Sequence, residues 1–170
     1  DTAVFNCDAT INRSTNFDLA AIEINNGATL FFNRTSGDPE THLNAINGNG
    51  TLAIMHGGLT GYTEDLVVAK DITIDYRPYT TDSWMKENNG HAIIVHGSID
   101  ASKAQFIAYS GLKQVDGDFI IGENKNNYVS SEVTFNGRVS VKNGAPLTLN
   151  STCVFNSDVS IAENSQMTIK

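Results

Sequence analysis

Residues 135–149 read FNGRVSVKNGAPLTL and residues 155–169 read FNSDVSIAENSQMTI, so one unit recurs without a gap and Phe155 takes the place of Phe135. The same kind of unit occurs near the start of the chain, where residues 4–11, VFNCDATI, match residues 154–161, VFNSDVSI. A fixed period, here the 20 residues from Phe135 to Phe155, indicates a repeat architecture, in which copies of one supersecondary unit stack on each other.

Each unit consists of short apolar stretches separated by corners. Residues 22–33, IEINNGATLFFN, overlay residues 139–150, VSVKNGAPLTLN, and this overlay places Asn26-Gly27 on Asn143-Gly144. Stretches of three to five residues rich in Val, Ile, Phe and Thr predict β-strands. Asn and Gly supply the positive φ that a tight corner needs. The best helical candidate, residues 62–70, is interrupted by β-branched residues, so we expect an all-β chain.

An all-β chain with this period is typical of a β-solenoid. One coil cannot bury its inward side chains alone, whereas stacked coils bury a continuous column and bond their backbones to the coils above and below. At ~20–24 residues per coil, residues 1–170 are expected to form a single solenoid segment of roughly seven to eight coils with loop insertions. Asn side chains at equivalent corners are expected to stack in hydrogen-bonded ladders. The alternative is a β-sandwich or jelly roll, which also consists of short strands.

The two cysteines, Cys7 and Cys153, distinguish these folds. In a sandwich they could pair and join the ends of the chain. In a solenoid they lie about six or seven coils apart, which is about 30 Å at ~4.8 Å per coil. A disulfide needs Cα atoms within ~7 Å of each other. The solenoid therefore predicts two unpaired, buried thiols.

The composition argues against several functions. The chain has 19 acidic and 11 basic residues, for a net charge of -8. Nucleic-acid binding needs a basic face, and so does docking on an anionic membrane surface. No run approaches ~18 consecutive apolar residues, so no membrane insertion is expected in this segment. Because the chain begins at Asp1 and ends within a repeat at Lys170, we expect it to be a fragment of a longer secreted protein.

The repeats FNGRVSVKNGAPLTL and FNSDVSIAENSQMTI resemble coils of bacterial autotransporter passenger domains and of haemagglutinin-type secreted adhesins. The resemblance is closest over residues 4–33 and 132–170. It implies a right-handed parallel β-helix that is secreted and displayed at the bacterial cell surface. The low charge and the abundant Asn, Thr, Gly and Ser agree with that location. The GDSG motif of the serine proteases found in some passengers is not present, so the resemblance implies no protease activity.

One segment interrupts the coil pattern and is the candidate binding site. Residues 76–90, YRPYTTDSWMKENNG, contain the only Trp of the chain together with two Tyr. Solenoids place insertions on loops, often on the binding face, and Trp, Tyr and Arg dominate binding hot spots. The alternative is a loop folded back on its own solenoid, with the Trp covering a side wall. The candidate binding residues are Tyr76, Arg77, Tyr79, Trp84 and Lys86.

No catalytic residue, metal site or cofactor is predicted. His56 and His96 each follow an apolar strand and precede Gly, which is typical of a corner residue, and a zinc site would need further ligands. Asp116-Gly117-Asp118 matches neither the EF-hand calcium loop nor the calcium-binding nonapeptide repeat. It is interpreted as a turn between two strands. The repeat does not place the acidic residues on one face, as acid/base catalysis would require.

These observations predict a non-enzymatic structural and binding segment of a bacterial secreted surface protein. It would serve as an adhesin or as a stalk that mediates attachment to a host or to other cells. The expected partner is a host surface glycan or protein, and the long side walls also allow self-association. Two alternatives remain. A polysaccharide-cleaving β-helix enzyme would carry clustered Asp or Glu in a groove, and a viral tailspike shaft would carry an apolar outward face for packing as a trimer.

Overall fold

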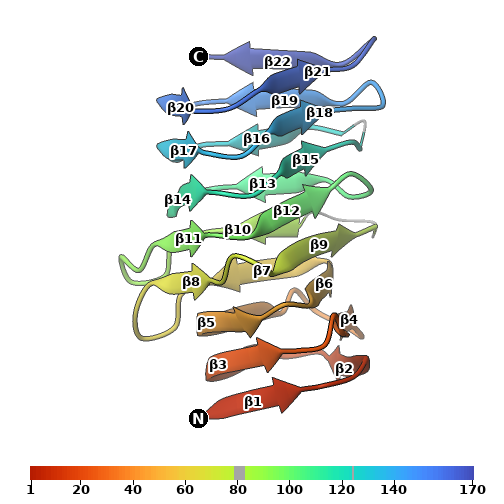
Figure 1. The fold of residues 1–170 in the computed structure, drawn as a ribbon, viewed down its shortest axis with the longest axis vertical. Helices are drawn as coiled ribbons and strands as arrows, with labels where there is room; N and C mark the ends of the chain where they lie inside the picture. Colours follow the sequence, from red (N-terminus) through yellow and green to blue (C-terminus); the bar gives the residue numbers. More distant parts are fainter. Residues whose placement is uncertain (79–82, 124) are drawn as a thin grey trace.

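The chain folds as a parallel β-solenoid of eight turns. The computed structural model describes residues 1–78, 83–123 and 125–170, and within these ranges it contains β-strands and no helix. The chain climbs from one end of the molecule to the other, with its two termini at opposite ends (Figure 1). The near strands run to the right as the chain climbs, which is the right-handed sense. This is the fold that the sequence repeat predicts, and the parallel pairing of the strands excludes the β-sandwich.

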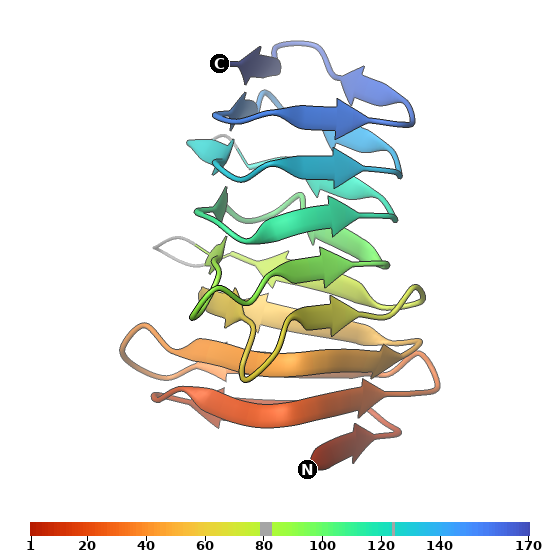
Figure 2. The ribbon, with the colours of Figure 1, turned by 90° about the vertical axis from the view of Figure 1, so that its left-hand side faces the viewer.

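Each turn contributes one strand to each of three walls, which Figure 2 shows as stacked rungs. Wall 1 contains β1 (Thr2–Phe5), the second halves of β3 (Phe17–Ile24) and β5 (Glu40–Gly48), β8 (Leu66–Val68), β11 (Ile93–Val95), β14 (Leu112–Val115), β17 (Val133–Phe135) and β20 (Cys153–Phe155). Wall 2 contains β2 (Ala9–Arg13), β4 (Thr29–Arg34), β6 (Thr51–Met55), β9 (Thr73–Arg77), β12 (Ser98–Ala101), β15 (Phe119–Ile121), β18 (Val139–Val141) and β21 (Val159–Ile161).

Wall 3 contains the first halves of β3 and β5, followed by β7 (Gly57–Thr60), β10 (Ser83–Met85), β13 (Phe106–Ala108), β16 (Asn127–Val129), β19 (Pro146–Leu149) and β22 (Gln166–Ile169). Walls 1 and 3 belong to one 14-stranded sheet because β3 and β5 run through the corner between them. Residues 40–42 of β5 pair with β7, and Ala45 and Ile46 pair with β8.

The period of the sequence repeat sets the register of the last turns. Phe119 pairs with Val139, and Val139 pairs with Val159. Earlier turns vary in length, and Leu66 pairs with Ile93 across a longer turn. Residues 22–33 and residues 139–150 have similar sequences, but they lie at different corners of the solenoid. The first segment passes from wall 1 to wall 2, and the second passes from wall 2 to wall 3.

The interior of the solenoid is a column of apolar side chains with an aromatic stack near its centre. Alternate residues of each strand point inward, and Phe106, Phe119 and Phe135 are at most 1% exposed. The ring of Phe119 lies 5.5 Å from that of Phe106 and 5.1 Å from that of Phe135, measured between centroids. Phe155 continues the stack 5.5 Å beyond Phe135. Such ring pairs stabilise the fold by more than the burial of their apolar area, because offset and edge-on contacts between aromatic rings are themselves favourable.

A polar ladder follows the corner between walls 1 and 2. Asn156 donates to Asn136 over 2.7 Å, and Asn136 donates to Asp116 over 2.6 Å. A ring nitrogen of His96 lies 2.6 Å from the other carboxylate oxygen of Asp116. Burial opposes ionisation of Asp116, but the hydrogen bonds with His96, Asn136 and Gln114 outweigh it and lower the pKa of Asp116. The expected stacking of Asn side chains is confirmed, and His96 takes part as a corner residue.

The two thiols lie on the first and last turns. Both cysteines are free, and the seven steps between their turns correspond to about 34 Å at ~4.8 Å per step. The prediction of unpaired thiols is therefore confirmed. The expectation that both are buried is wrong, since Cys7 is exposed and Cys153 is half-buried. Cys7 lies in the corner between β1 and β2, where its side chain is outside the apolar column.

Candidate functional site

The structure separates the predicted binding residues instead of gathering them on one loop. Tyr76 is fully buried in β9, where its ring lies 5.3 Å from that of Phe106, so it is not available to a ligand. Arg77 follows on the opposite face of the same strand and pairs with Asp75 at 2.7 Å on the outside of wall 2. Alternation of side chains along a strand is the reason for this separation. Tyr79 lies outside the described residues.

Trp84 and Lys86, in contrast, lie on the outer face of wall 3. Trp84 is the central residue of β10, and its neighbours Ser83 and Met85 point inward. The indole lies over Gly58 of the turn below, where a Cβ would collide with Nε1 of Trp84. The ring of His56 meets the indole edge-on at 5.3 Å. Because Gly58 has no side chain, the indole of Trp84 can pack directly against the backbone of wall 3.

Aromatic side chains continue outward on wall 3 over four successive turns. Tyr62 follows β7, Trp84 is in β10, Tyr109 follows β13 and Tyr128 is in β16. Tyr62 is 37% exposed and Tyr109 is 46% exposed. The rings of Tyr109 and Tyr128 lie 5.8 Å apart in an edge-on contact. The row is staggered: Trp84 and Tyr128 share one register position two turns apart, and Tyr109 and Tyr62 lie two and four residues further along their turns. Over four turns at ~4.8 Å per turn, the row covers about 14 Å along the solenoid axis.

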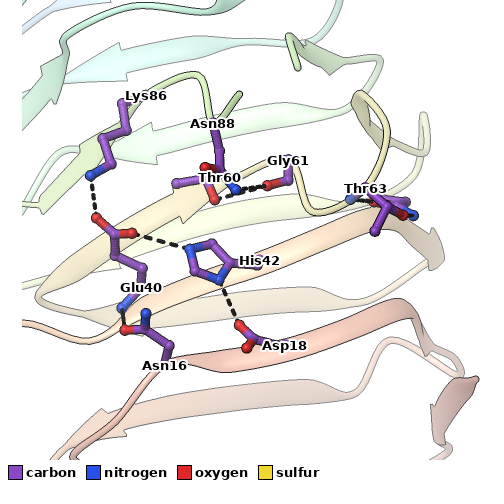
Figure 3. Close-up of polar contacts among 10 residues, drawn as sticks. Asn16, Asp18, Glu40, His42, Thr60, Gly61, Thr63, Lys86 and Asn88 are labelled. Carbon is purple, nitrogen blue, oxygen red and sulfur yellow. Dashed lines mark hydrogen bonds and ion pairs between the residues drawn. The ribbon is translucent and has the colours of Figure 1, made fainter. Parts of the chain in front are cut away.

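An ionic network lies on the outer face of wall 3 at its lower end (Figure 3). The ring nitrogens of His42 lie 2.5 Å from Asp18 and 3.1 Å from Glu40, and Lys86 forms an ion pair with Glu40. His42 also stacks on Tyr62, with centroids 6.5 Å apart and planes inclined by 8°. Burial alone would raise the pKa of Glu40, but its hydrogen bonds with Lys86 and His42 outweigh burial and lower the pKa.

The outer face of wall 2 carries a second arrangement of charged residues. Asp75 and Asp100 are paired in register on adjacent turns. Burial raises the pKa of Asp75, and the charge of Asp100 adds to this, although Arg77 opposes it. A hollow of about 350 Å³ lies on the same wall and is lined by Phe31, Ala53 and Arg77 among others. Within the described residues, no three His, Cys, Asp or Glu side chains are grouped so that they could hold a metal ion.

Glu40 and Asp75 are expected to give stability opposite dependences on pH. The lowered pKa of Glu40 means that its contribution is present above its ordinary pKa of 4.5 and is lost as the pH falls. The raised pKa of Asp75 means that its contribution is present below its ordinary pKa of 3.8 and is lost as the pH rises. In denaturation measured from about pH 3 to pH 6, Glu40→Gln should flatten the rise in unfolding free energy and Asp75→Asn should steepen it. If the unfolding free energy changed with pH at the same slope in both variants and in the parent, this assignment would be contradicted.

Sequence reasoning identified Trp84 and Lys86 but missed the residues that accompany them. Tyr128 is the middle residue of NYV and pairs with Thr148 of PLTL one full period later, so the repeat itself could have placed it on the outside of wall 3. Asp18, Glu40 and His42 carry no such signal, because the early turns vary in length.

The fold and this face define a parallel β-solenoid with an aromatic outer wall. Comparisons with protein-family models, with curated proteins and with solved structures gave no match. Among the residues that the structure describes, no helix is long and apolar enough to cross a membrane.

Proposed function

We propose that this chain is a non-enzymatic structural and binding segment of a secreted bacterial surface protein, an adhesin or its stalk, that attaches to a surface glycan through the outer face of wall 3. The observation that carries the proposal is the row of Tyr62, Trp84, Tyr109 and Tyr128 on four successive turns. Aromatic rings present large apolar faces with polar edges, and they lose little entropy on binding.

The shape of the row favours an extended ligand. The staggered row spreads across wall 3 and covers about 14 Å along the solenoid axis at ~4.8 Å per turn. Sugar rings combine apolar C–H faces with hydroxyl groups, so they can rest on the aromatic rings and bond to polar groups beside them. Asp18, Glu40, His42 and Lys86 supply such groups at the lower end of the row.

The charges on this face favour a neutral glycan over a strongly charged one. Glu40 is already bonded to Lys86 and His42, and His42 is bonded to Asp18. Because these groups largely satisfy each other, this network presents no concentrated charge of one sign. The stacked turns hold the face on a rigid support, which suits a segment that projects from a cell surface. The low charge of the chain and the resemblance of its repeats to passenger-domain coils support that location.

The proposal predicts that Trp84→Ala weakens glycan binding about thirtyfold, because truncating a central aromatic anchor costs ~2 kcal/mol. Ligands would first be selected on an array of neutral and acidic oligosaccharides, and their affinities measured by titration calorimetry. Phe31→Ala is the matched control, since Phe31 is a half-buried aromatic residue on the outer face of wall 2. If Phe31→Ala loses binding and Trp84→Ala does not, the binding face is wall 2 and the proposal is wrong.

A polysaccharide-cleaving activity is the second candidate, and one observation favours it. Asp75 and Asp100 lie on adjacent turns of wall 2, and the pKa of Asp75 is raised by burial, as a general acid requires. This activity predicts release of new chain ends from a bound polysaccharide, abolished by Asp75→Asn and by Asp100→Asn but retained in Trp84→Ala at saturating substrate. Binding without the release of chain ends would exclude it for that polysaccharide.

A further inference from the structure

Arg13 places a cation inside the solenoid. It is the last residue of β2 and points inward, with only 5% of its surface exposed. Its guanidinium lies over the ring of Phe32, 5.0 Å from the centroid. The guanidinium reaches toward the third turn, where a Cβ on Gly57 would be 3.2 Å from Nη2. Among the residues that the structure describes, none accepts a hydrogen bond from Nε, Nη1 or Nη2.

Two further donors point into the interior of the solenoid, on its second and fourth turns, and have no hydrogen-bond partner within the described part of the chain. The hydroxyl of Tyr76 is one of them; it is fully buried and interacts electrostatically with Arg13. The hydroxyl of Thr41, also 0% exposed, is the other. The carboxylate of Asp38 accepts no hydrogen bond from Arg13; its Oδ1 lies 2.8 Å from Nε2 of His56 and accepts a hydrogen bond of 3.3 Å from Arg34.

The charge state of Arg13 decides what kind of ligand fits here. Burial lowers the pKa of Arg13 to about 10, which leaves the guanidinium charged at neutral pH. A buried charge without a partner is costly, and proteins almost always satisfy such groups. These groups are one cation and two hydroxyls, all of which can donate hydrogen bonds to an anion.

We propose that Arg13 and the hydroxyl of Tyr76 form an interior binding site for a small monovalent anion, with chloride as the physiological occupant. Thr41 lies on the next turn of the same interior and is a further donor for this site. The ligand must be small because packed side chains such as Phe32 surround the guanidinium. This inference concerns the inside of the solenoid and stands independently of glycan binding on wall 3.

Bromide tests the site directly, because it resembles chloride and scatters X-rays anomalously. Crystals of the whole chain soaked in sodium bromide should show an anomalous peak within hydrogen-bonding distance of the Arg13 guanidinium. In solution, bromide should raise the melting temperature by about 3 °C or more over gluconate at equal ionic strength, since gluconate is too large to enter. Arg13→Met should abolish this difference, and Arg138→Met, a change outside the core, should keep it.

The outcomes separate an anion from the other ways of satisfying Arg13. An interior peak that is present in the parent chain and absent in Arg13→Met supports the proposal. A water molecule at that position with no anomalous signal overturns it, and so does an equal bromide effect in the parent and Arg13→Met. If Arg13→Met does not fold, the bromide-soaked parent crystal still decides between the two.

Discussion

Replacing Phe119 by alanine should lower the free energy of unfolding by about 3–5 kcal/mol. Phe119 is fully buried, and its ring lies between those of Phe106 and Phe135. Truncation removes both ring contacts and leaves a cavity that the rigid coils on either side cannot close. Chemical denaturation followed by circular dichroism would measure the loss.

Ile120→Ala provides the control for this change. Ile120 is the next residue of β15, but it points outward and is half-buried, so its loss should cost much less than that of Phe119. Because stability in a solenoid is a sum over neighbouring turns, the damage from Phe119→Ala should centre on turns five to seven. If the two variants were equally stable, the aromatic stack would not be the main support of these turns.

Deleting residues 136–155 should leave a folded solenoid that is one turn shorter. This segment is one full period of the repeat, and its removal joins Phe135 directly to Asn156. Val159 would then pair with Phe119 in place of Val139, because the three residues occupy the same position on wall 2. The denaturant m-value should fall by roughly one eighth, in proportion to the surface that is no longer buried.

Deleting only residues 136–145 is the contrasting experiment. Half a period moves the remaining strands to the wrong walls and brings corner residues such as Ser151 and Ser157 to positions that face the core, so the last turns should lose their packing. Hydrogen exchange would locate the loss, with protection retained in the first six turns and absent beyond Phe135. Equal protection in the two deletions would show that the period of the repeat does not determine the register.

The parts of the fold that could be predicted are those where the chain repeats itself without insertions. Phe135 and Phe155 occupy equivalent positions because residues 135–169 contain two gapless units. Local similarity alone was a weaker guide. Residues 22–33 match residues 139–150, but the two segments lie at different corners, since every corner joins two short strands with the same turn chemistry.

The candidate site could be predicted only in part for the same reason. Trp84 stood out by composition, but its position on wall 3 depends on pairing with Gly58 of the preceding turn, at a separation that no fixed period indicates. Tyr76 was misplaced because the sequence gives no mark of where β9 ends and the connection to β10 begins. One residue of difference in that boundary decides whether a side chain enters the core or faces solvent.

The direction of the hydrogen bonds described above has a mechanical consequence. Strands run across the long axis, so the bonds between turns lie parallel to it, and the termini are at opposite ends (Figure 1). Tension applied to the two ends therefore loads only the bonds of the outermost turn at any moment. Such a rod resists compression but yields under pulling by peeling, each turn of the last part of the chain releasing about 70 Å of extended backbone. A rod of this kind would lengthen in steps under tension instead of unfolding all at once.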